Sequence, residues 1–333
     1  NCELDVKQCG LKEEKFMKYI NEFKESDAIR GIYFCKNKQE ATTRNGRPYI
    51  TVTLQDKTGA IEGKIWEPNS PRIQTFEKMD YIDISGNVSC YNGELQVLIQ
   101  GLKPALEGEY NIADYMPTTT KDIPKMYQEL CRYLSSVKNP HLLELCNQYF
   151  LKNKEFAASF QMNSGAKSVH HGFVGGLLEH TLNVVRLCNC FCQTYPDLNR
   201  DLLLTAAAFH DVGKMRELSP FPENDYTDEG QLLGHVYMGT EFVTDATRKI
   251  EGFPKALAKE LCHCILAHHG ELEFGSPKKP ATLEALALHY ADLADSKLET
   301  VREALFNVKP DEEWTAYNRF LDGRFKKSYT VDA

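Results

Sequence analysis

Hydrophobic and polar positions follow two different periods along the chain, and the change falls near residue 105. Before it, apolar and polar residues alternate, as in Tyr49-Ile50-Thr51-Val52-Thr53-Leu54, which is the period of a half-buried strand. From about residue 121 onward, apolar residues recur every three or four positions, which is the period of an amphipathic helix. The pattern therefore predicts an α+β multidomain protein, with a β domain followed by an all-α domain.

Polar turns divide the first segment into short strands. They fall at residues 42–47 and 56–59 and at Asn92-Gly93, and such clusters break regular structure. The strands predicted between and around them cover residues 29–36, 49–54, 60–66, 81–88 and 94–100. Five strands in so short a segment, with a polar connector between the third and the fourth, predict a small closed barrel of the OB type.

The helical pattern continues almost to the end of the chain and predicts a helical bundle. The predicted helices cover residues 125–136, 142–150, 176–193, 201–209, 234–248, 255–269 and 282–306. Gly270 follows the sixth of these, at the position where a helix end favours glycine. A further short helix is expected at residues 11–25, with Phe16, Ile20 and Phe23 on one side.

These patterns divide the chain into an N-terminal extension (1–27), an OB-type domain (28–105), a linker (106–120) and a helical domain with a C-terminal tail (121–333). The hydrophobic content of 42% and charged content of 26% are those of an ordinary globular protein. No apolar run reaches the length of a membrane span, and no signal segment opens the chain. The eleven scattered cysteines favour reduced thiols and a cytoplasmic location.

The charge distribution points to a nucleic-acid-binding module. A net charge of −8 excludes a generally basic coat protein, but residues 28–103 carry +2 and the remainder carries −10. Tyr49 and Trp66 alternate away from inward-facing isoleucines, so they are candidate platforms for stacking bases. Basic residues that could follow the phosphates are Arg30, Lys36, Arg44, Arg47 and Lys64. The alternative is that these aromatic side chains pack against a neighbouring domain.

Histidines and aspartates in the helical segment form the strongest functional signal. Nine of the ten histidines lie between residues 170 and 289. Several share a helical face with apolar residues: His180, His210-Asp211, His235, His268 and Asp292. Taken singly, each could be a hydrogen-bonded core histidine or a capping aspartate. Burying so many polar groups without partners would be costly, whereas a shared divalent cation would satisfy them together, so the set predicts a metal site for hydrolysis.

His180, His210-Asp211 and Asp292 resemble the signature of the HD-domain metal-dependent phosphohydrolases. The additional His235 and His268-His269 resemble the richer version of that site, as in HD-GYP-type enzymes, which can hold two metals. Over most of the chain from about residue 28, the sequence is most similar to the YhaM-type 3′-to-5′ exoribonucleases. The segments that carry this resemblance are residues 170–181, 210–214, 229–235, 268–277, 288–292 and 314–319.

The resemblance implies a role for each of these residues. His180, His210, Asp211 and Asp292 would hold one divalent ion, and Asp211 would bridge to a second. That second ion would be held by His235, His268 and His269. Mn²⁺ is the implied metal, with Fe, Co or Ni as alternatives. Lys214 would contact a phosphate oxygen, or would be a solvated lysine; His170 and His171 would contact substrate or the leaving oxygen, or support the site structurally. His263 and His289 are expected in the core or behind the ligands.

Three functions follow, in order of preference. The first is metal-dependent 3′-to-5′ hydrolysis of single-stranded RNA, with DNA not excluded, to nucleoside 5′-monophosphates. The second is a phosphodiesterase acting on small or cyclic nucleotides, with the barrel as a regulatory module, although residues 270–273 do not lead into the Gly-Tyr-Pro segment of cyclic-dinucleotide enzymes. The third is a non-catalytic nucleic-acid-binding protein with a structural metal. The sequence leaves a homo-oligomer open.

Overall fold

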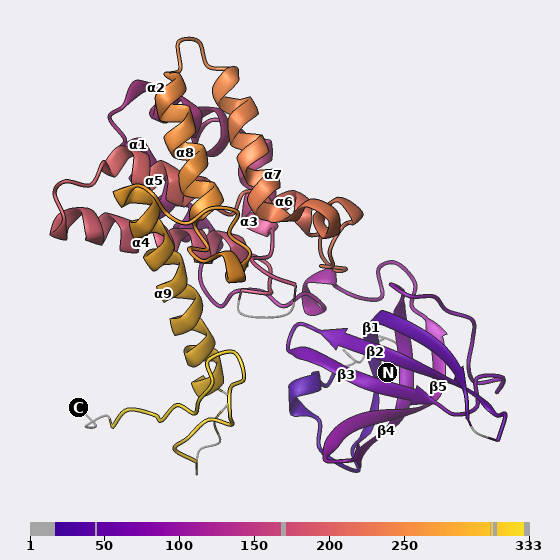
Figure 1. Cartoon of the computed structure of the whole chain (residues 1–333). Coiled ribbons are helices and arrows are strands. Elements are labelled where there is room, and N and C mark those ends of the chain that lie inside the picture. The colour runs from indigo at the N-terminus through magenta and orange to yellow at the C-terminus, as the bar shows by residue number, and fades with distance from the viewer. Residues whose placement is uncertain (1–16, 44, 168–170, 307, 309–311, 330–333) are drawn as a thin grey trace, which may run out of the picture. The chain divides into compact units, whose positions relative to one another are not determined.

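The computed structural model describes residues 17–43, 45–167, 171–306, 308 and 312–329. The chain divides into two compact units, one that ends at Pro117 and one that begins at Thr118. Figure 1 shows a β-barrel in the first unit and a bundle of helices in the second. The predicted fold class, an OB-type barrel followed by an all-α domain, is confirmed.

The barrel consists of five strands in the order β1-β2-β3-β5-β4, closed by pairing between β4 and β1. All pairs are antiparallel except β3 with β5. The strands are β1 (Ala28–Thr42), β2 (Pro48–Asp56), β3 (Gly59–Ile65), β4 (Tyr81–Tyr91) and β5 (Glu94–Pro104). The barrel interior is filled by alternate side chains such as Val52, Leu54, Ile82 and Val97, all of which are fully buried.

Strand β1 is longer than predicted because it pairs with two neighbours in succession. Its first part, through Phe34, pairs with β4, and from Phe34 onward it pairs with β2, with an irregularity between Cys35 and Asn37. The second half is largely polar and exposed from residue 39 onward, so it has no alternation of apolar residues from which a strand could be recognised.

The helix predicted at residues 11–25 is wrong where it can be compared with the structure. Residues 11–16 lie outside the described residues, and the rest contains only a single 3-10 turn, η1 (Ile20–Glu22). This segment is tied to the barrel, because the backbone N–H of Ile20 donates to Asp56 Oδ2 at 2.7 Å. Phe23 enters the barrel core edge-on to Tyr33, with ring centroids 5.9 Å apart. The apolar residues of this segment therefore contact the barrel individually, and do not form one face of a helix.

The second unit is built from helices whose bounds agree with the periodicity to within a few residues, except that α7 begins six residues earlier than predicted. They are α1 (Ile123–Ser135), α2 (Pro140–Cys146), α3 (Lys154–Met162), α4 (Gly176–Thr194), α5 (Arg200–Phe209), α6 (Lys214–Glu217), α7 (Asp228–Arg248), α8 (Lys255–Ala267) and α9 (Leu283–Phe306). The pattern did not reveal the short helices α3 and α6. The predicted helix at 142–150 divides into α2 and a π-helical turn, η3 (Asn147–Leu151).

Helix α5 lies at the centre of this unit and packs against α4, α8 and α9. Its residues 202–209 are all buried, and its three consecutive alanines, Ala206, Ala207 and Ala208, allow the neighbouring helices to approach closely. Phe150, Phe160 and Phe209 form the aromatic part of the same core. A fully buried leucine or phenylalanine stabilises a fold by about 2 kcal/mol, so this core fixes the end of α5, from which the functional residues project.

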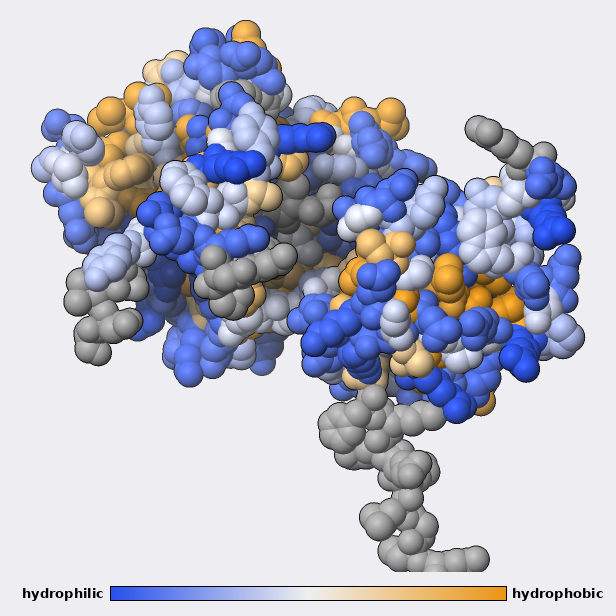
Figure 2. All heavy atoms as spheres, turned by 90° about the horizontal axis from the view of Figure 1, so that it is seen from below, coloured by the Kyte–Doolittle hydropathy of each residue, from blue (hydrophilic) through white to orange (hydrophobic). Residues whose placement is uncertain are grey.

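Beyond α9, the described residues 312–329 include a hairpin-like turn. Trp314 bridges to Lys326 and Asn318 bridges to Gly323. Hydrophilic residues predominate on the face shown in Figure 2, and apolar residues appear there as separate patches. Among the described residues, no helix combines the length and apolar character needed to cross a lipid bilayer.

Candidate metal centre

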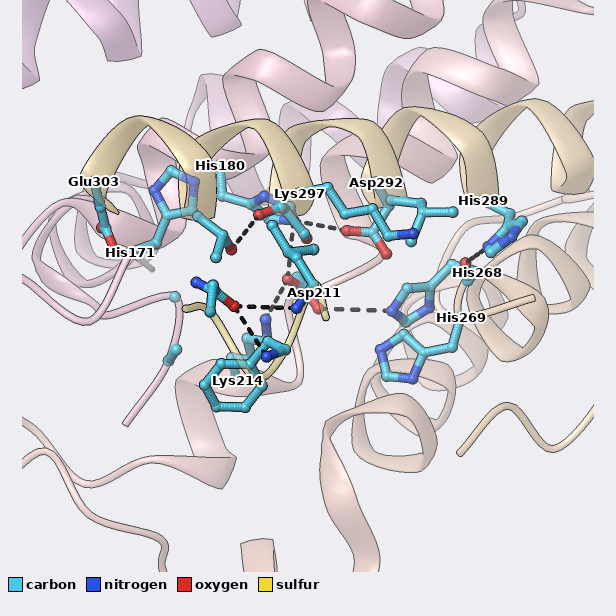
Figure 3. A pocket seen from close by; sticks show the side chains of 18 of the residues that line it. His171, His180, Asp211, Lys214, His268, His269, His289, Asp292, Lys297 and Glu303 are labelled. Carbon is cyan, nitrogen blue, oxygen red and sulfur yellow. Dashed lines mark hydrogen bonds and ion pairs between the residues drawn. The ribbon is translucent and has the colours of Figure 1, made fainter. Parts of the chain in front are cut away.

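The structure brings together all seven residues that the sequence predicts as metal ligands, from five separate segments. Figure 3 labels His180, Asp211, His268, His269 and Asp292 among them. His180 lies on α4, His210 and Asp211 directly follow α5, and Asp292 lies on α9. His235 follows a break in α7 at Gly234, whose φ of 73° interrupts the helix. His268 and His269 follow α8, which ends before Gly270 with φ of 79°.

Two glycines allow the segments that carry these side chains to approach one another. Gly213, next to the His210-Asp211 pair, packs so closely on α7 that a Cβ atom there would lie 2.1 Å from the carbonyl oxygen of His235. Gly239, one turn further along α7, faces the backbone of Gly213 in return. This contact places His235 beside Asp211.

The first group of ligand atoms consists of His180, His210, Asp211 and Asp292. His180 Nε2 lies 3.1 Å from His210 Nε2, 3.2 Å from Asp292 Oδ1 and 3.4 Å from Asp211 Oδ2. His210 Nε2 lies 3.5 Å from the same Asp211 oxygen. Ligand atoms that share one octahedral ion at bond lengths of about 2.1 Å are separated by about 3 Å, so the spacing suits a single cation.

The second group lies on the other side of Asp211. His235 Nε2 is 3.3 Å from His269 Nε2. The remaining oxygen of Asp211, Oδ1, lies 3.6 Å from His235 Nε2 and 3.8 Å from His268 Nε2. Asp211 therefore directs one carboxylate oxygen at each group.

Hydrogen bonds at the back of the rings fix the tautomers of four histidines. Nδ1 of His180 donates to Asp295 at 2.7 Å and Nδ1 of His235 donates to Glu217 at 2.9 Å. Nδ1 of His210 and of His268 donate to the carbonyl oxygens of Ala207 and Ile265. A neutral imidazole that donates from Nδ1 presents a lone pair at Nε2, and all four lone pairs converge on Asp211.

These atoms fit a divalent cation and do not satisfy one another. If both imidazoles were neutral, the Nε2 lone pairs of His210 and His180 would face each other at 3.1 Å and could not form a hydrogen bond, so this pair needs a cation or a proton between its nitrogens. Within the described part of the chain, the buried atoms Asp211 Oδ1 and His268 Nε2 have no hydrogen-bond partner. Buried polar atoms are normally paired, so their convergence indicates a place for a cation.

The electrostatics of the first group also call for positive charge. Burial acts to lower the pKa of His180, but Asp292 and Asp295 together raise it to about 10. Burial lowers the pKa of His210 and of His268, which keeps both imidazoles neutral. For Asp211, burial acts to raise the pKa, yet Lys214 and the surrounding histidines hold it well below its ordinary value. The carboxylate is therefore ionised and available to a metal.

Lys214 and His171 line the same pocket, which has a volume of about 860 Å³. Lys214 is not the solvated lysine considered as an alternative: its side chain is 18% exposed and Nζ lies 2.7 Å from Asp211 Oδ2. His171 is buried, and its Nε2 lies 3.1 Å from Asp295, behind His180. His170 lies outside the described residues.

Sequence reasoning missed the carboxylates that support the ligands. Asp295 serves both His180 and His171, while Glu217 accepts from the ring and from the backbone N–H of His235. One pattern in the sequence could have indicated them, because each acid lies one helical turn beyond a predicted functional residue. Asp295 follows Asp292 in this way, and Glu217 follows Lys214. His289 supports the site as well, because its Nδ1 donates to the carbonyl oxygen of His268 at 2.8 Å.

The predicted nucleic-acid contacts lie on the barrel, and the structure groups three of them. Tyr49 and Trp66 lie against each other with ring centroids 5.1 Å apart, and Lys64 Nζ lies 5.7 Å from the Tyr49 ring. Trp66 is 52% exposed. Lys64 also pairs with Glu62 at 3.0 Å, so its charge is partly neutralised. Arg47 is exposed beside β2, and Arg44 lies outside the described residues.

Comparison with known proteins agrees with both halves of the fold. The HD domain matches residues 177–296 and the OB-fold nucleic acid binding domain matches residues 34–105. A 3′-5′ exoribonuclease YhaM from Bacillus velezensis is 34% identical over 289 residues, which cover 86% of this chain and 90% of that protein. The proteins of the same name from Bacillus subtilis and Shouchella clausii are 34% and 33% identical, over 83% and 89% of this chain and 87% and 92% of their own lengths.

The fold and the site together define a metal-dependent phosphohydrolase of the HD class that carries an OB-fold nucleic-acid-binding domain. An HD site with this set of histidines and aspartates implies dependence on a divalent metal. Identity and coverage then place the protein more closely: the chain belongs to the family of YhaM 3′-5′ exoribonucleases.

Proposed function

We propose that this chain is a metal-dependent 3′-to-5′ exoribonuclease, which hydrolyses single-stranded RNA and releases nucleoside 5′-monophosphates. The observation that carries the proposal is the carboxylate of Asp211, which directs one oxygen at each of two histidine groups. A single-metal binding protein has no need for this arrangement. A two-metal hydrolase uses it to act on both the attacking and the leaving oxygen of a phosphodiester.

Seven side chains would hold two ions, of which Mn²⁺ suits the mixture of imidazoles and carboxylates best. Divalent cations, when bound, supply the charge that polarises a phosphodiester and lowers the pKa of water. Asp211 would belong to both ion sites, and Asp292, His180 and His210 would complete the first. His235, His268 and His269 would complete the second.

The remaining polar residues of the pocket would position the strand. Lys214 is held at the site by Asp211, and its ammonium group would neutralise a non-bridging phosphate oxygen next to the scissile bond. His171 lines the pocket while its Nε2 is held by Asp295. We propose that it keeps Asp295, and through it His180, in the ligating geometry, and that it borders the path of the leaving oxygen.

The barrel would bind the strand and feed it to the metal centre. Tyr49 and Trp66 offer two adjacent aromatic faces, to which unpaired bases of any sequence can stack. Lys64 and Arg47 beside them, with Arg44, would contact phosphates. The cysteines of the described residues are free thiols, which fits the reducing cytoplasm as the place where RNA is turned over.

The test is a time course on a 5′-labelled single-stranded RNA with added Mn²⁺, beside a DNA of the same sequence and a chelator control. We expect products that shorten from the 3′ end, nucleoside 5′-monophosphates by chromatography, and complete loss of activity with chelator. The DNA lane measures the preference for the sugar.

An RNA that stays intact in the presence of metal would contradict the proposal. Turnover of small or cyclic nucleotides by the same preparation would then favour a phosphodiesterase with a regulatory barrel. Deletion of residues 1–110 sharpens the distinction, because a barrel that feeds the strand should affect the hydrolysis of long RNA far more than that of a dinucleotide.

A further inference from the structure

We propose that the pocket beside the metal centre binds the nucleoside at the 3′ end of the strand, and that Phe320 stacks on its base. This inference rests on the proposed function and names the part of the substrate that the pocket recognises. It assigns a substrate-binding role to the C-terminal hairpin around residues 314–326, which lies outside the segment matched by the HD domain.

The hairpin is held in place by its own backbone. The N–H of Thr315 donates to the carbonyl oxygen of Phe325 at 2.9 Å, and the N–H of Asn318 donates to that of Gly323 at 2.8 Å. The side-chain oxygen of Asn318 then accepts from the backbone N–H groups of Phe320 and Leu321, at 2.9 and 3.0 Å. The position of Phe320 is thus set by the turn.

Phe320 lines the pocket yet is not used for packing. Its side chain is 81% exposed, although it belongs to the same pocket wall as Asn318 and Leu321 and shares that pocket with Asp211 and Lys214. An isolated exposed phenylalanine is ordinary on a protein surface. Phe320, however, is held by a turn at a pocket that contains a candidate metal centre. Its ring therefore offers a flat apolar face to a ligand bound in that pocket.

Helix α9 lines the pocket with polar and positively charged side chains, in contrast to the apolar ring of Phe320. Ser296 follows Asp292 by one helical turn, so the helix carries a hydroxyl group about 6 Å beyond the metal centre. Thr300, one turn further along, donates its hydroxyl to the carbonyl oxygen of Ser296 at 2.7 Å. Lys297 also lines the pocket (Figure 3). Within the described part of the chain, no carboxylate pairs with its ammonium group, which leaves a cation available to an anionic ligand.

A nucleotide combines the features that this pocket offers to a ligand. Its base has a flat face for Phe320, its ribose has hydroxyl groups for Ser296, and its phosphate has charge for Lys214 and Lys297. A volume of about 860 Å³ accommodates a ligand of that size. Because the scissile phosphate must lie at Asp211, a nucleoside bound in the adjoining pocket is the one that hydrolysis releases.

The experiment pairs a change in the protein with a change in the RNA. Phe320→Ala, Phe320→Trp and the wild type are assayed at saturating Mn²⁺ for release of the first nucleotide. The substrates are a single-stranded RNA, the same RNA with an abasic 3′-terminal nucleotide, and the same RNA with an abasic penultimate nucleotide. Tyr329→Ala is the matched control, because Tyr329 is 91% exposed in the same C-terminal segment and does not line the pocket.

Loss of a base-stacking contact lowers binding roughly 5- to 100-fold, so we expect Phe320→Ala to raise KM on intact RNA by that factor. On RNA with an abasic 3′-terminal nucleotide, Phe320→Ala and the wild type should be equally slow. Phe320→Trp should retain the wild-type KM, and Tyr329→Ala should behave as the wild type on every substrate. Binding of Mn²⁺, measured by calorimetry, should be unchanged in all variants.

Equal KM values for Phe320→Ala and the wild type on intact RNA would overturn the inference. A rise in KM for Phe320→Ala that persists on the RNA with an abasic 3′-terminal nucleotide would also overturn it. The same holds for a rise in KM that disappears only on the RNA with an abasic penultimate nucleotide, because Phe320 would then stack on a different base. The proposed function has a separate failure: a wild-type protein that does not shorten RNA at all.

Discussion

Asp295 accepts a hydrogen bond of 2.7 Å from Nδ1 of His180, and through it α9 holds an imidazole that projects from α4. The same carboxylate oxygen also lies 3.1 Å from His171 Nε2. Asp295 thus sets the tautomer and the direction of His180, so that Nε2 faces His210, Asp211 and Asp292. A residue that touches neither substrate nor metal in the proposed arrangement therefore controls the geometry of one that binds metal.

Replacement of Asp295 by Asn should weaken metal binding without removing a ligand. The amide keeps the shape of the side chain but loses the charge that favours a proton on Nδ1 of His180. Loss of such a supporting partner lowers metal affinity by about 10- to 100-fold. We expect the concentration of Mn²⁺ that gives half-maximal RNA hydrolysis to rise by this factor, with activity largely recovered at high Mn²⁺.

The control for this substitution is Asp245→Asn on α7, where the aspartate is exposed and pairs with Arg248. That variant should keep the metal dependence of the wild type. An Asp295→Asn protein with the wild-type response to Mn²⁺ would show that the contact with His180 is of no consequence for metal binding.

The sequence was sufficient to predict that these histidines and aspartates cluster, because each lies at a position whose neighbours must be buried. The helical phase of His180, His268 and Asp292 follows from leucines and alanines one or two turns away, and close packing of α5 leaves only one place where these side chains can meet. The OB-type barrel was predictable for the same reason, from alternating residues such as Ile50, Val52 and Leu54.

The supporting residues were harder to predict, because an acid one helical turn beyond a functional residue is a common pattern and does not by itself identify an acceptor for Nδ1. Glu217 lies on α6, a helix of four residues that is too short to show a period. It reaches His235 only because Gly234 interrupts α7 with a positive φ. Phe320 lies in a turn, where an exposed aromatic residue carries no signal until the pocket it faces is known.

Asp211 and His269 should differ in how many ions their replacement removes. Asp211 faces both groups, whereas His269 lies in the second group, next to His235 and His268. We expect two Mn²⁺ ions per chain in the wild type, about one in His269→Ala, and a loss of tight binding at both sites in Asp211→Asn. Hydrolysis by Asp211→Asn should fall by at least about 100-fold, while its affinity for RNA stays that of the wild type.

Metal content by mass spectrometry, thermal unfolding and RNA binding distinguish the outcomes. If Asp211→Asn retained both ions and full hydrolysis, the bridging role would be wrong. If it lost its cooperative thermal unfolding, the metal would be structural instead.

Gly213→Ala should separate the two ligand groups by steric conflict. A methyl group at this position would lie 2.1 Å from the carbonyl oxygen of His235, so α6 or α7 must shift. Overpacking of this kind costs about 1–3 kcal/mol in the free energy of unfolding, and displacement of His235 should weaken the second metal site. Denaturant unfolding and Mn²⁺ titration measure both effects. Gly323→Ala is the control, since its nearest neighbour would lie at 3.7 Å; equal stability of the two variants would refute the prediction.

Trp66→Ala should lower the affinity for single-stranded RNA and leave the chemical step intact. Trp66 contacts Tyr49 on the barrel, and it belongs to a different compact unit from the metal centre. Loss of one stacked base costs roughly 5- to 100-fold in binding. We therefore expect the Kd for RNA and the KM for long RNA to rise by this factor, whereas kcat and the hydrolysis of a dinucleotide remain unchanged.

Tyr91→Ala is the matched control, because Tyr91 is a 66% exposed aromatic residue at the end of β4 and outside the Tyr49–Trp66 pair. If Trp66→Ala and Tyr91→Ala bind RNA equally well, the pair is not the stacking platform, and packing against another part of the protein becomes the better account of these rings.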